Sequence, residues 1–273
     1  MGRVVLGGYT SLGIGGEAEA VIVRSREQIP EVLTTCGVIL GRGTNVLISD
    51  DGVTDRVAIN RISTVVFDGT HVYAGSGASL ASLAAMCCER GLSGLEWACG
   101  IPGSVGGAAV MNAGAFGGDF ASVAARVDVF RDGEEQSLKP CECGFGYRTS
   151  GFGGGDFVSG AAFELSRSTP EKIMAAQREY TRRRELTQPK GRSAGCVFRR
   201  VGDVSAAYYI DRAGLKGERE GGASVSQLHA GFIINDGTAT ARDYLRLTER
   251  IEEEVRNKFG ITLDREIRII GEI

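Results

Sequence analysis

The fold and ligand class rest on two glycine-rich stretches, GIPGSVGGAAVMNAGAFGG at residues 100–118 and GRGTN at residues 41–45. Consecutive small residues expose successive backbone N–H groups, and a concave row of such donors suits a pyrophosphate. The alternative is that both loops only turn tightly, which glycine permits at little steric cost. Two such loops in one domain favour a ligand with a long diphosphate.

Other nucleotide-binding motifs do not fit this sequence. GIGGEA (Gly13–Ala18) matches the pattern G-x-G-x-x-A, but it precedes a predicted strand, whereas the dinucleotide-binding motif follows one. The chain contains no Gly-Lys dipeptide, which excludes a Walker A loop. A chance match in a glycine-rich chain is the better explanation of GIGGEA.

Around the two loops, strands and helices occur in an order that predicts the α+β class, without regular βαβ alternation. Strands are expected at residues 18–25, 37–40 and 157–166 and in the closing segment 265–273. Hairpins are expected at 64–77, with the turn around Asp68–Gly69, and at 127–138, with the turn around Asp132–Gly133. Helices are expected at 26–33, 78–91, 168–186 and 241–259. In the last helix Tyr244, Leu247, Ile251, Val255 and Phe259 share one face, and Thr240 with Asp243 has capping-box spacing.

Composition limits the class of protein. Glycine supplies 41 of 273 residues, about twice its usual share of roughly 7%. The net charge of −3 provides no electrostatic footprint for nucleic acid or an anionic membrane. No apolar run approaches the roughly 18 residues of a membrane span, and the first 16 residues contain no apolar core of the signal-peptide type. We therefore expect a cytoplasmic protein.

The cysteines and histidines do not suggest a metal site. Seven cysteines, an odd number, are irregularly spaced and are interpreted as reduced thiols. Cys141 and Cys143 have no partner motif for zinc, and Cys87 and Cys88 fit ordinary helix packing. His71 and His229 are too few for a three-histidine site, so no metal is expected.

Seven blocks, in this order, resemble the UDP-N-acetylenolpyruvoylglucosamine reductase family. They are YTSLGIGGEAE, GRGTNVLISDDG, GSGASLASLAAMCCERGLSGLEWACGIPGSVGGAAVMNAGAFGG, FGYRTS, TQPKGRSAGCVFRR, YYIDRAGLKGEREGGASVSQLHAGFIINDGTATARD and LDREIRII. The resemblance implies an enzyme of peptidoglycan precursor synthesis that binds FAD non-covalently and uses NADPH as co-substrate. It would reduce the enolpyruvyl ether of UDP-N-acetylglucosamine enolpyruvate to UDP-N-acetylmuramate.

The resemblance also implies a domain plan. An FAD-binding domain of the vanillyl-alcohol-oxidase type would span residues 1–167, in two subdomains of about 1–55 and 56–167. A smaller α+β substrate-binding domain would span 168–260, and a C-terminal strand at 261–273 would return to the FAD domain. There is no room between Phe163 and Gly191 for the tyrosine-bearing insertion of the longer subclass, so the chain resembles the shorter subclass.

The family's cofactor and substrate residues are carried over by position. The FAD contacts fall on Gly41, Arg42, Gly43, Thr44 and Asn45 and on Gly103, Ser104, Gly107, Asn112 and Gly114. The substrate contacts fall on Tyr147, Arg200, Gln227 and His229. Arg200 stands where the family often has asparagine and Gln227 where lysine is frequent, so recognition of the diphosphate is where this chain departs from the family.

Three residues match the family's catalytic positions. Arg148, in FGYR, would bind the substrate carboxylate, for which a planar guanidinium is suited. Glu266, in LDREIR, matches the catalytic glutamate, and Cys196, in SAGCVF, stands in place of the family's proton-donating serine. Taken singly, these residues would be a surface salt bridge, an outward-facing strand residue and a buried small hydrophobe.

Two rival functions stay open on sequence alone. A different flavin oxidase on the same fold would lack the pair SAGCVF and LDREIR at these positions. A non-catalytic UDP-sugar or nucleotide-binding protein that had lost its flavin would not need both glycine-rich loops. We expect a monomer or weakly associating dimer whose partners are the UDP-sugar and NADPH, with no nucleic acid and no membrane.

Overall fold

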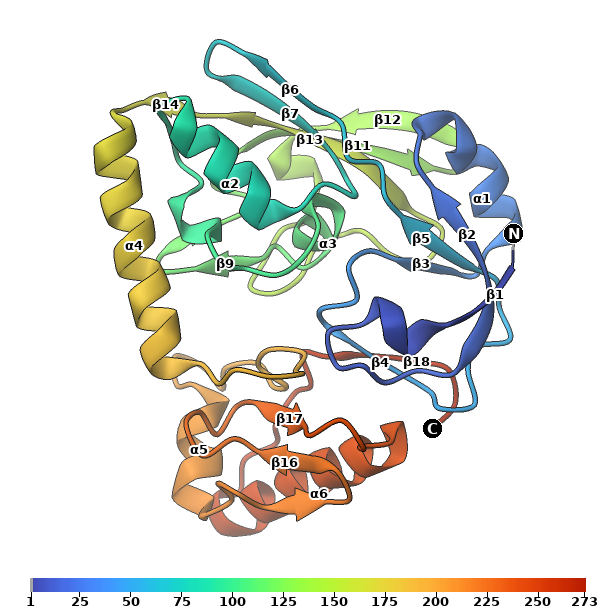
Figure 1. Cartoon of the computed structure of the whole chain (residues 1–273), viewed down its shortest axis with the longest axis vertical. Coiled ribbons are helices and arrows are strands. Elements are labelled where there is room, and N and C mark those ends of the chain that lie inside the picture. Colours follow the sequence, from blue (N-terminus) through green and yellow to red (C-terminus); the bar gives the residue numbers. More distant parts are fainter. Residues whose placement is uncertain (1) are drawn as a thin grey trace. The chain divides into compact units, whose positions relative to one another are not determined.

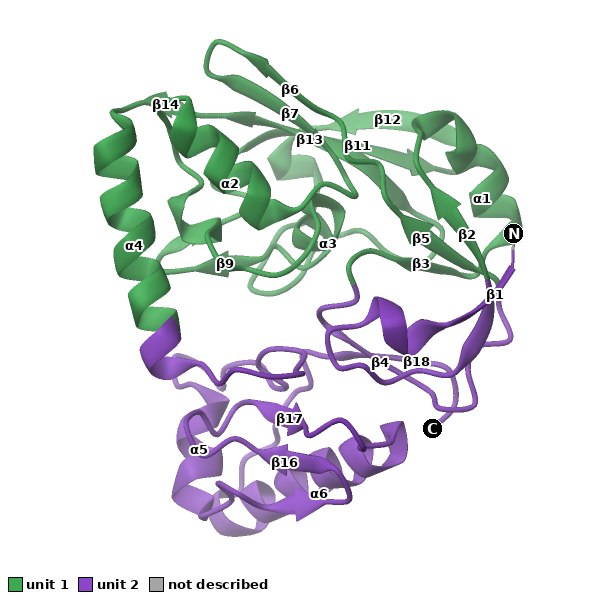
Figure 2. Cartoon of the chain, viewed as in Figure 1, with its two compact units in different colours: residues 1, 20–42, 56–184 green, residues 2–19, 43–55, 185–273 purple. Residues whose placement is uncertain are grey.

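The computed structural model describes residues 2–273 and divides the chain into two compact units. Unit 1 comprises residues 20–42 and 56–184, and unit 2 comprises residues 2–19, 43–55 and 185–273 (Figure 2). The described chain therefore passes from one unit to the other after Glu19, Arg42, Asp55 and Arg184. Each unit is consequently assembled from segments that are far apart in the sequence.

Unit 1 contains a small parallel sheet. Its strands are β2 (Glu17–Val23), β3 (Val38–Leu40) and β5 (Val57–Asn60), and β5 lies between the other two, parallel to both. Helix α1 (Ile29–Thr35) connects β2 to β3 and has proline in its first turn, where a missing N–H is tolerated. Its buried Ile29 and Val32 pack with Ala58 of β5. This parallel pairing places the ends of β3 and β5 beside each other.

A five-stranded antiparallel sheet forms the larger part of unit 1. Its order is β12-β11-β13-β7-β6, from β6 (Val65–Asp68), β7 (His71–Gly75), β11 (Ala124–Arg131), β12 (Glu134–Leu138) and β13 (Phe157–Glu164). Both predicted hairpins are confirmed, because β6 pairs with β7 and β11 with β12. Asp132 and Gly133 both have positive φ, as a two-residue hairpin turn requires.

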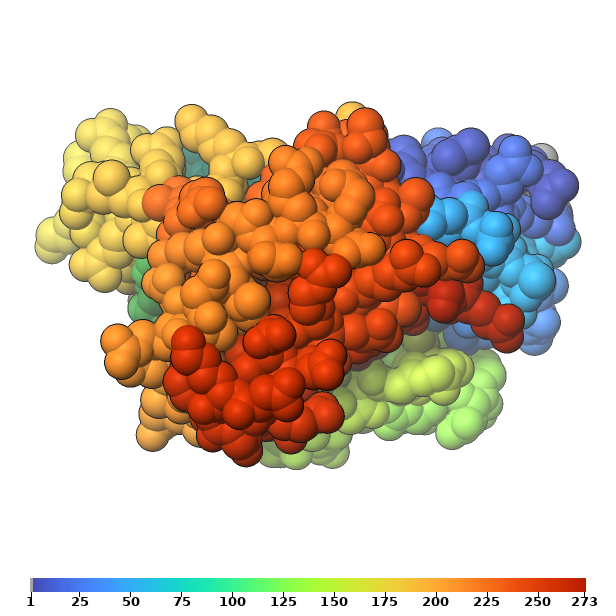
Figure 3. Space-filling view, turned by 90° about the horizontal axis from the view of Figure 1, so that it is seen from below, coloured from blue at the N-terminus to red at the C-terminus, as the bar shows by residue number. Residues whose placement is uncertain are grey.

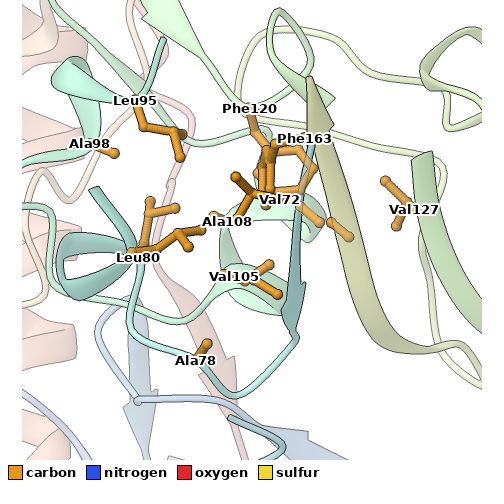
Figure 4. Packing of buried hydrophobic residues seen from close by; sticks show 14 of the residues in the cluster. Val72, Ala78, Leu80, Leu95, Ala98, Val105, Ala108, Phe120, Val127 and Phe163 are labelled. Carbon is orange, nitrogen blue, oxygen red and sulfur yellow. The ribbon is translucent and has the colours of Figure 1, made fainter. Parts of the chain in front are cut away.

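Helices α2 (Leu80–Glu89) and α3 (Val105–Val110) pack against this sheet and close its core (Figure 1). The long α4 (Pro170–Thr187) lies beside α2, where Gln177 donates to the Ala84 carbonyl oxygen. Figure 4 shows Leu80 of α2 and Val105 of α3 gathered with Val72 and Phe163 of the sheet, and all four are buried. Short strand pairs complete the unit: β8 (Leu92–Ser93) with β14 (Ser166–Arg167), and β9 (Gly114–Ala115) with β10 (Gly118–Asp119).

Unit 2 packs two helices and an antiparallel sheet around one core. The sheet order is β15-β16-β17, from β15 (Arg219–Glu220), β16 (Ala223–Val225) and β17 (Ile233–Asn235), and the helices are α5 (Ala206–Ala213) and α6 (Ala241–Phe259). The C-terminal third of the sequence, orange to red, forms one continuous surface of this unit in Figure 3. The core also takes in Leu12 and Leu47 from the first part of the chain.

Helix α6 has the bounds and the cap that the sequence predicts. Thr240 and Asp243 form the capping box, and Gly260 ends the helix in the left-handed conformation. Tyr244, Leu247 and Ile251 are buried on its inner face. The C-terminal strand β18 (Arg268–Ile270) pairs in parallel with β4 (Val46–Ile48), and β1 (Gly2–Val5) lies at the start of the described chain.

The structure confirms the α+β class. The compact units are defined by contacts and differ in extent from the predicted functional domains, 1–167, 168–260 and 261–273, which stay a prediction. Within residues 2–273, no helix combines the length and the apolar character that crossing a bilayer demands.

Candidate functional site

The two predicted glycine-rich loops meet within unit 1 at Gly41 and Ser104. A β-carbon built on Gly41 would lie 2.7 Å from the Ser104 hydroxyl oxygen, so no side chain fits there without movement of that serine. Ser104 caps α3, and its hydroxyl accepts a hydrogen bond from the Gly107 amide at 3.3 Å. Arg61 holds the first loop by donating to the carbonyl oxygen of Gly41 at 2.8 Å. Residues 41 and 103–107, which are remote in sequence, are therefore neighbours.

A third segment, residues 75–79, packs against these two loops and was not predicted to belong to the site. The amide of Gly106 donates to the carbonyl oxygen of Ser76 at 2.8 Å, and that of Val105 to Ala78 at 2.9 Å. A β-carbon on Gly106 would lie only 2.8 Å from the β-carbon of Ser76. The available signal was the run GSGAS at residues 75–79, where the predicted hairpin passes into the predicted helix, a third cluster of small residues in the same region.

Asn112 and Gly114, from the second predicted set, are held against the loop that carries Arg148. The Asn112 amide group donates to the Gly146 carbonyl oxygen at 3.0 Å and accepts from the Ala121 amide at 2.9 Å. Arg148 donates to the carbonyl oxygen of Gly114 at 2.8 Å. The structure thus brings the predicted catalytic arginine beside the predicted cofactor contacts of unit 1.

Arg148 also has an unusual backbone conformation. Its φ is +53°, in the left-handed region that side chains other than Gly, Asn and Asp seldom adopt. Its guanidinium carbon lies 5.5 Å from the ring centroid of Tyr147, which is itself exposed. Non-glycine residues held in this region concentrate at functional sites, where the surrounding structure imposes the strain. This geometry is consistent with a binding role for the Tyr147–Arg148 pair.

The rest of the first predicted loop, Gly43–Asn45, belongs to unit 2. A β-carbon on Gly43 would lie 2.2 Å from the carbonyl oxygen of Tyr9, and the Gly43 φ of +63° also requires glycine. Asn45 donates through its side chain to the carbonyl oxygen of Glu266 at 3.0 Å. Arg42, which precedes them in unit 1, is exposed, and Thr44 is half-buried. Asn45 therefore ties this loop to the segment of the predicted catalytic glutamate.

Cys196 and Glu266 lie on adjacent segments of unit 2. The Val197 carbonyl oxygen accepts a hydrogen bond from the Glu266 amide at 2.7 Å, and the Arg199 amide donates to the Asp264 carbonyl oxygen at 2.8 Å. On its other side, the backbone of Cys196 forms an antiparallel β-bridge with the backbone of Phe232. Both Cys196 and Glu266 are half-buried. The segment of Cys196 is thus held between residues 264–267 and residues 231–232.

A bidentate ion pair anchors the residue before Glu266. The Arg265 guanidinium binds both carboxylate oxygens of Glu252 in α6, at 2.5 and 2.8 Å. Such a planar pair has defined geometry as well as charge complementarity. It fixes the backbone from which the Glu266 side chain extends.

The predicted substrate residues of unit 2 differ in their surroundings. His229 accepts a hydrogen bond from the Gly231 amide at 3.1 Å, and its ring lies against Phe232. Burial lowers the pKa of His229, and the nearby Lys216 charge lowers it further. Gln227 is exposed beside Gly217, and Arg200 is exposed at the end of the segment that contains Cys196. His229 is thus the residue of this group that the fold holds in place.

Two of the remaining thiols are buried and protonated groups that lie outside the site. Burial raises the pKa of Cys87 to about 12 and that of Cys143 to about 11, which agrees with a packing role for Cys87. None of the seven cysteines is part of a disulfide in residues 2–273. Among the residues that the structure describes, no group of three or more His, Cys, Asp or Glu side chains could hold a metal ion.

Comparisons with known proteins cover nearly the whole chain. Residues 187–270 match the family model described as UDP-N-acetylenolpyruvoylglucosamine reductase, C-terminal domain, and residues 18–136 match an FAD binding domain. A protein from Symbiobacterium thermophilum named UDP-N-acetylenolpyruvoylglucosamine reductase 2 is 41% identical, over 96% of this chain and 89% of its own. A protein from Streptococcus pneumoniae named UDP-N-acetylenolpyruvoylglucosamine reductase is 38% identical, over 97% of this chain and 91% of its own.

A solved structure agrees with these relatives. The crystal structure of UDP-N-acetylenolpyruvylglucosamine reductase from Thermus caldophilus is 38% identical and matches with a TM-score of 0.89. The match covers 99% of this chain and 98% of the other. Sequence and fold therefore point to the same group of proteins.

Proposed function

The chain belongs to the UDP-N-acetylenolpyruvoylglucosamine reductase family, and on this premise we propose that it uses NADPH to reduce the enolpyruvyl ether of UDP-N-acetylglucosamine enolpyruvate, giving UDP-N-acetylmuramate. It is an FAD-dependent oxidoreductase of peptidoglycan synthesis. Between Phe163 and Gly191 the described chain contains the end of β13, β14, α4 and the short segments that join and follow them, which fits the shorter subclass.

The residues present fit FAD. In unit 1 the backbones of residues 41, 76–78 and 103–107 approach so closely that a β-carbon on Gly41 or Gly106 would collide. A surface made of backbone amides and small residues suits a diphosphate, which needs close approach and hydrogen-bond donors. Gly41, Arg42, Gly103, Ser104 and Gly107 would hold the cofactor from this unit. Asn112 and Gly114 of unit 1 are also proposed contacts. Gly43, Thr44 and Asn45, which belong to unit 2, are proposed from the family resemblance alone.

When bound, FAD supplies hydride transfer, and the protein supplies orientation and charge. In the reaction, the terminal alkene carbon gains a hydride, and negative charge develops on the adjacent carbon and its carboxylate. Arg148 would bind that carboxylate, where a preorganised cation stabilises the charge that develops in the transition state. The strained backbone of Arg148 and its bond to Gly114 support this placement.

A proton must then reach the carbon next to the carboxylate. Cys196 would donate it: the S–H bond breaks, the C–H bond forms, and the electron pair of the S–H bond stays on sulfur. Glu266 would act as the hydrogen-bonded partner of this step. The observation that carries this proposal is the bond between the Glu266 amide and the Val197 carbonyl oxygen, which keeps both residues on neighbouring segments. His229, whose pKa is lowered by burial, would present an uncharged ring to the substrate.

We further propose that the protein acts in the cytoplasm as a monomer or weakly associating dimer. The cytoplasm is where a nucleotide sugar and NADPH are both available. The net charge of −3 and cysteines that are not joined in disulfides fit this placement. Size-exclusion chromatography with light scattering over a hundredfold range of protein concentration tests the oligomeric state, and a stable trimer or larger assembly would contradict it.

Flavin absorbance tests the function directly. Bound flavin should lose its visible absorbance on addition of NADPH without oxygen, and regain it on addition of the enolpyruvyl UDP-sugar. A different flavin oxidase would bleach but would not recover with this sugar. A non-catalytic binding protein would do neither. Failure of the UDP-sugar to restore the absorbance would exclude the proposed reaction.

A further inference from the structure

The turn between β9 and β10 has phenylalanine at a position that disfavours it. Ala115 pairs with Gly118, which leaves Phe116 and Gly117 as a two-residue turn. Both have positive φ, +54° and +86°, as a type I′ turn requires. Asparagine, aspartate or glycine normally occupies the first position of such a turn, and a bulky side chain there is strained. The turn Asp132–Gly133 follows this preference, so Phe116 needs another explanation.

The ring of Phe116 packs against helix α4, which runs past the β9–β10 hairpin (Figure 1). It stacks on the ring of Tyr180, with the ring centroids 4.4 Å apart and the ring planes 1° from parallel. One turn further along α4, the guanidinium carbon of Arg184 lies 5.2 Å from the centroid of the Phe116 ring. Aromatic stacking and a cation facing a ring are both attractive. These two contacts explain why phenylalanine occupies the turn despite its unfavourable backbone conformation.

Helix α4 is itself fixed to the body of unit 1. Gln177 donates through its side chain to the carbonyl oxygen of Ala84 in α2 at 3.1 Å. The thiol of Cys99 donates to the Gln177 carbonyl oxygen at 3.5 Å, and its sulfur lies 3.9 Å from the Thr181 hydroxyl oxygen. Gln177 and Thr181 lie within one helical turn of Tyr180. The Tyr180 ring therefore extends from a part of α4 that is held in place.

The turn lies next to the residue that orients Arg148. Gly114, two residues before Phe116, accepts a hydrogen bond from the Arg148 guanidinium at 2.8 Å. Four residues other than glycine have positive φ in the described chain, and three of them, Asn112, Phe116 and Arg148, lie on the two segments that this bond joins. Strained residues of this kind concentrate at functional sites. A shift of the turn would move the carbonyl oxygen that holds Arg148.

We propose that Tyr180 is a positioning residue for the reduction of the UDP-sugar. Its ring holds Phe116, and the turn that contains Phe116 holds the Gly114 carbonyl oxygen to which Arg148 is bound. This role rests on the proposed function, in which Arg148 binds the substrate carboxylate. Reduction of flavin by NADPH does not involve that carboxylate, so loss of the stack should affect the second half-reaction alone. That step slows because the guanidinium no longer lies where negative charge develops.

The test compares the two half-reactions in protein loaded with FAD. Tyr180→Leu removes the ring, and Tyr180→Phe keeps it, since stacking does not need the hydroxyl. In anaerobic stopped-flow experiments, NADPH should reduce the flavin of Tyr180→Leu at the wild-type rate, whereas the limiting rate of reoxidation by the enolpyruvyl UDP-sugar should fall about tenfold. Tyr180→Phe should match wild type in both steps. Arg178→Leu, an exposed change on the same helix, is the control and should also match wild type.

Two further variants separate positioning from folding. Phe116→Asn removes the ring but supplies a residue that this turn prefers, so the hairpin should stay folded while reoxidation slows about tenfold. In an Arg148→Ala background, Tyr180→Leu should cause no further slowing, because no guanidinium remains to be positioned. A structural role would instead slow both half-reactions and would add to the effect of Arg148→Ala. Thermal unfolding checks each variant, and Phe116→Asn carries the test if Tyr180→Leu does not fold.

Labelling of Arg148 tests the positioning without the reaction. Phenylglyoxal modifies arginine, and peptide mass mapping gives the rate for Arg148 alone. This rate should rise about fivefold in Tyr180→Leu and stay at the wild-type value in Tyr180→Phe, because a hydrogen bond that holds the guanidinium is weakened. If the UDP-sugar does not reoxidise wild-type flavin, the proposed function falls, and the labelling still decides whether the stack holds Arg148. Equal labelling of wild type and Tyr180→Leu, or reoxidation of Tyr180→Leu at the wild-type rate, overturns the proposal.

Discussion

The amide nitrogen of Glu266 lies 2.7 Å from the carbonyl oxygen of Val197 and donates a hydrogen bond to it. This bond joins the C-terminal segment to the residue that follows Cys196, and the Arg199 amide donates to Asp264 between the same two segments. Glu266 and Cys196 belong to the same compact unit, so their relationship does not depend on how the two units are arranged. Substitutions at either position can therefore be interpreted against a fixed local frame.

Cys196 gives the turnover of the UDP-sugar a characteristic dependence on pH. A thiol can donate a proton only below its pKa, so activity should fall as the pH rises through that value; an unperturbed thiol ionises near 8.5. The Cys196→Ser variant should retain substantial activity and lose this alkaline decline, because a hydroxyl does not ionise in that range. Cys196→Ala should still be reduced by NADPH but fail to complete reduction of the enolpyruvyl group. Steady-state rates from pH 6 to 10 measure the alkaline decline in wild type and its loss in Cys196→Ser. If Cys196→Ala turns over the UDP-sugar at the wild-type rate, Cys196 is not the proton donor.

Replacing Arg148 should separate the two half-reactions. Arg148→Ala should leave reduction of bound flavin by NADPH nearly unchanged and slow the second half-reaction by about 10²–10³-fold, because a stabiliser of developing charge is lost. Stopped-flow absorbance measures both steps. Arg148→Lys, which keeps the charge but not the planar fork, should recover part of the rate. If both half-reactions slow equally, Arg148 maintains the loop near Gly114 instead.

Gly41 should contribute to the affinity for flavin. In Gly41→Ala the new methyl group would lie 2.7 Å from the Ser104 hydroxyl oxygen and displace the cap of α3. We expect FAD to bind on the order of tenfold more weakly, or about 1.4 kcal/mol, as measured by fluorescence titration of the apoprotein. Gly153→Ala is the control, because no atom lies within 4 Å of the β-carbon built there. Equal affinity in the two variants would remove Gly41 from the cofactor site.

The Arg131–Asp156 pair should make stability depend on pH at the acid end. Hydrogen bonds from Arg131, at 2.7 Å to each carboxylate oxygen, hold the pKa of Asp156 below its usual range. Because the folded-state pKa is depressed, this contribution is fully present above the unfolded value, about 4, and is lost as the pH falls through the folded value. In Asp156→Asn the free energy of unfolding at pH 7 should be about 1 kcal/mol lower than in wild type. It should also decrease less than that of wild type between pH 5 and pH 3. Urea titrations measure this, with the exposed Asp203→Asn as control. Parallel pH curves for wild type and Asp156→Asn would contradict the assignment.

Local chemistry was enough to predict several elements from the sequence. The apolar positions of α6 recur at helical spacing, and Thr240, Asp243 and Gly260 mark its ends, so its bounds agree with the prediction. The turn residues Asp132 and Gly133 specify a hairpin because their positive φ angles match the strand twist. The seven sequence blocks were sufficient to identify the family, which the relatives and the solved structure confirm.

Part of the candidate site could also be predicted from sequence, and part could not. Gly41 and Ser104 were assigned to one ligand, and the structure places them together. The run Ser76–Ala78 was passed over, although it pairs with the backbone of Val105 and Gly106. Its residues are small and polar like those of many loops, and nothing in their own spacing indicates which other loop they contact.

The sequence by itself determined helices α1, α2, α4 and α6, the hairpins, the family and the identity of the reactive groups, because those depend on periodicity, turn chemistry and residue type, whereas the short helices α3 and α5 were not predicted. Only the tertiary structure decided that β5 lies between β2 and β3, that β18 pairs with β4, and that Glu266 lies beside the segment of Cys196. The same holds for Tyr244: its helical face was predictable, but its unpartnered hydroxyl was not. The physical reason is that strand pairing and burial of a single polar atom are set by contacts between distant segments, which local preferences do not encode.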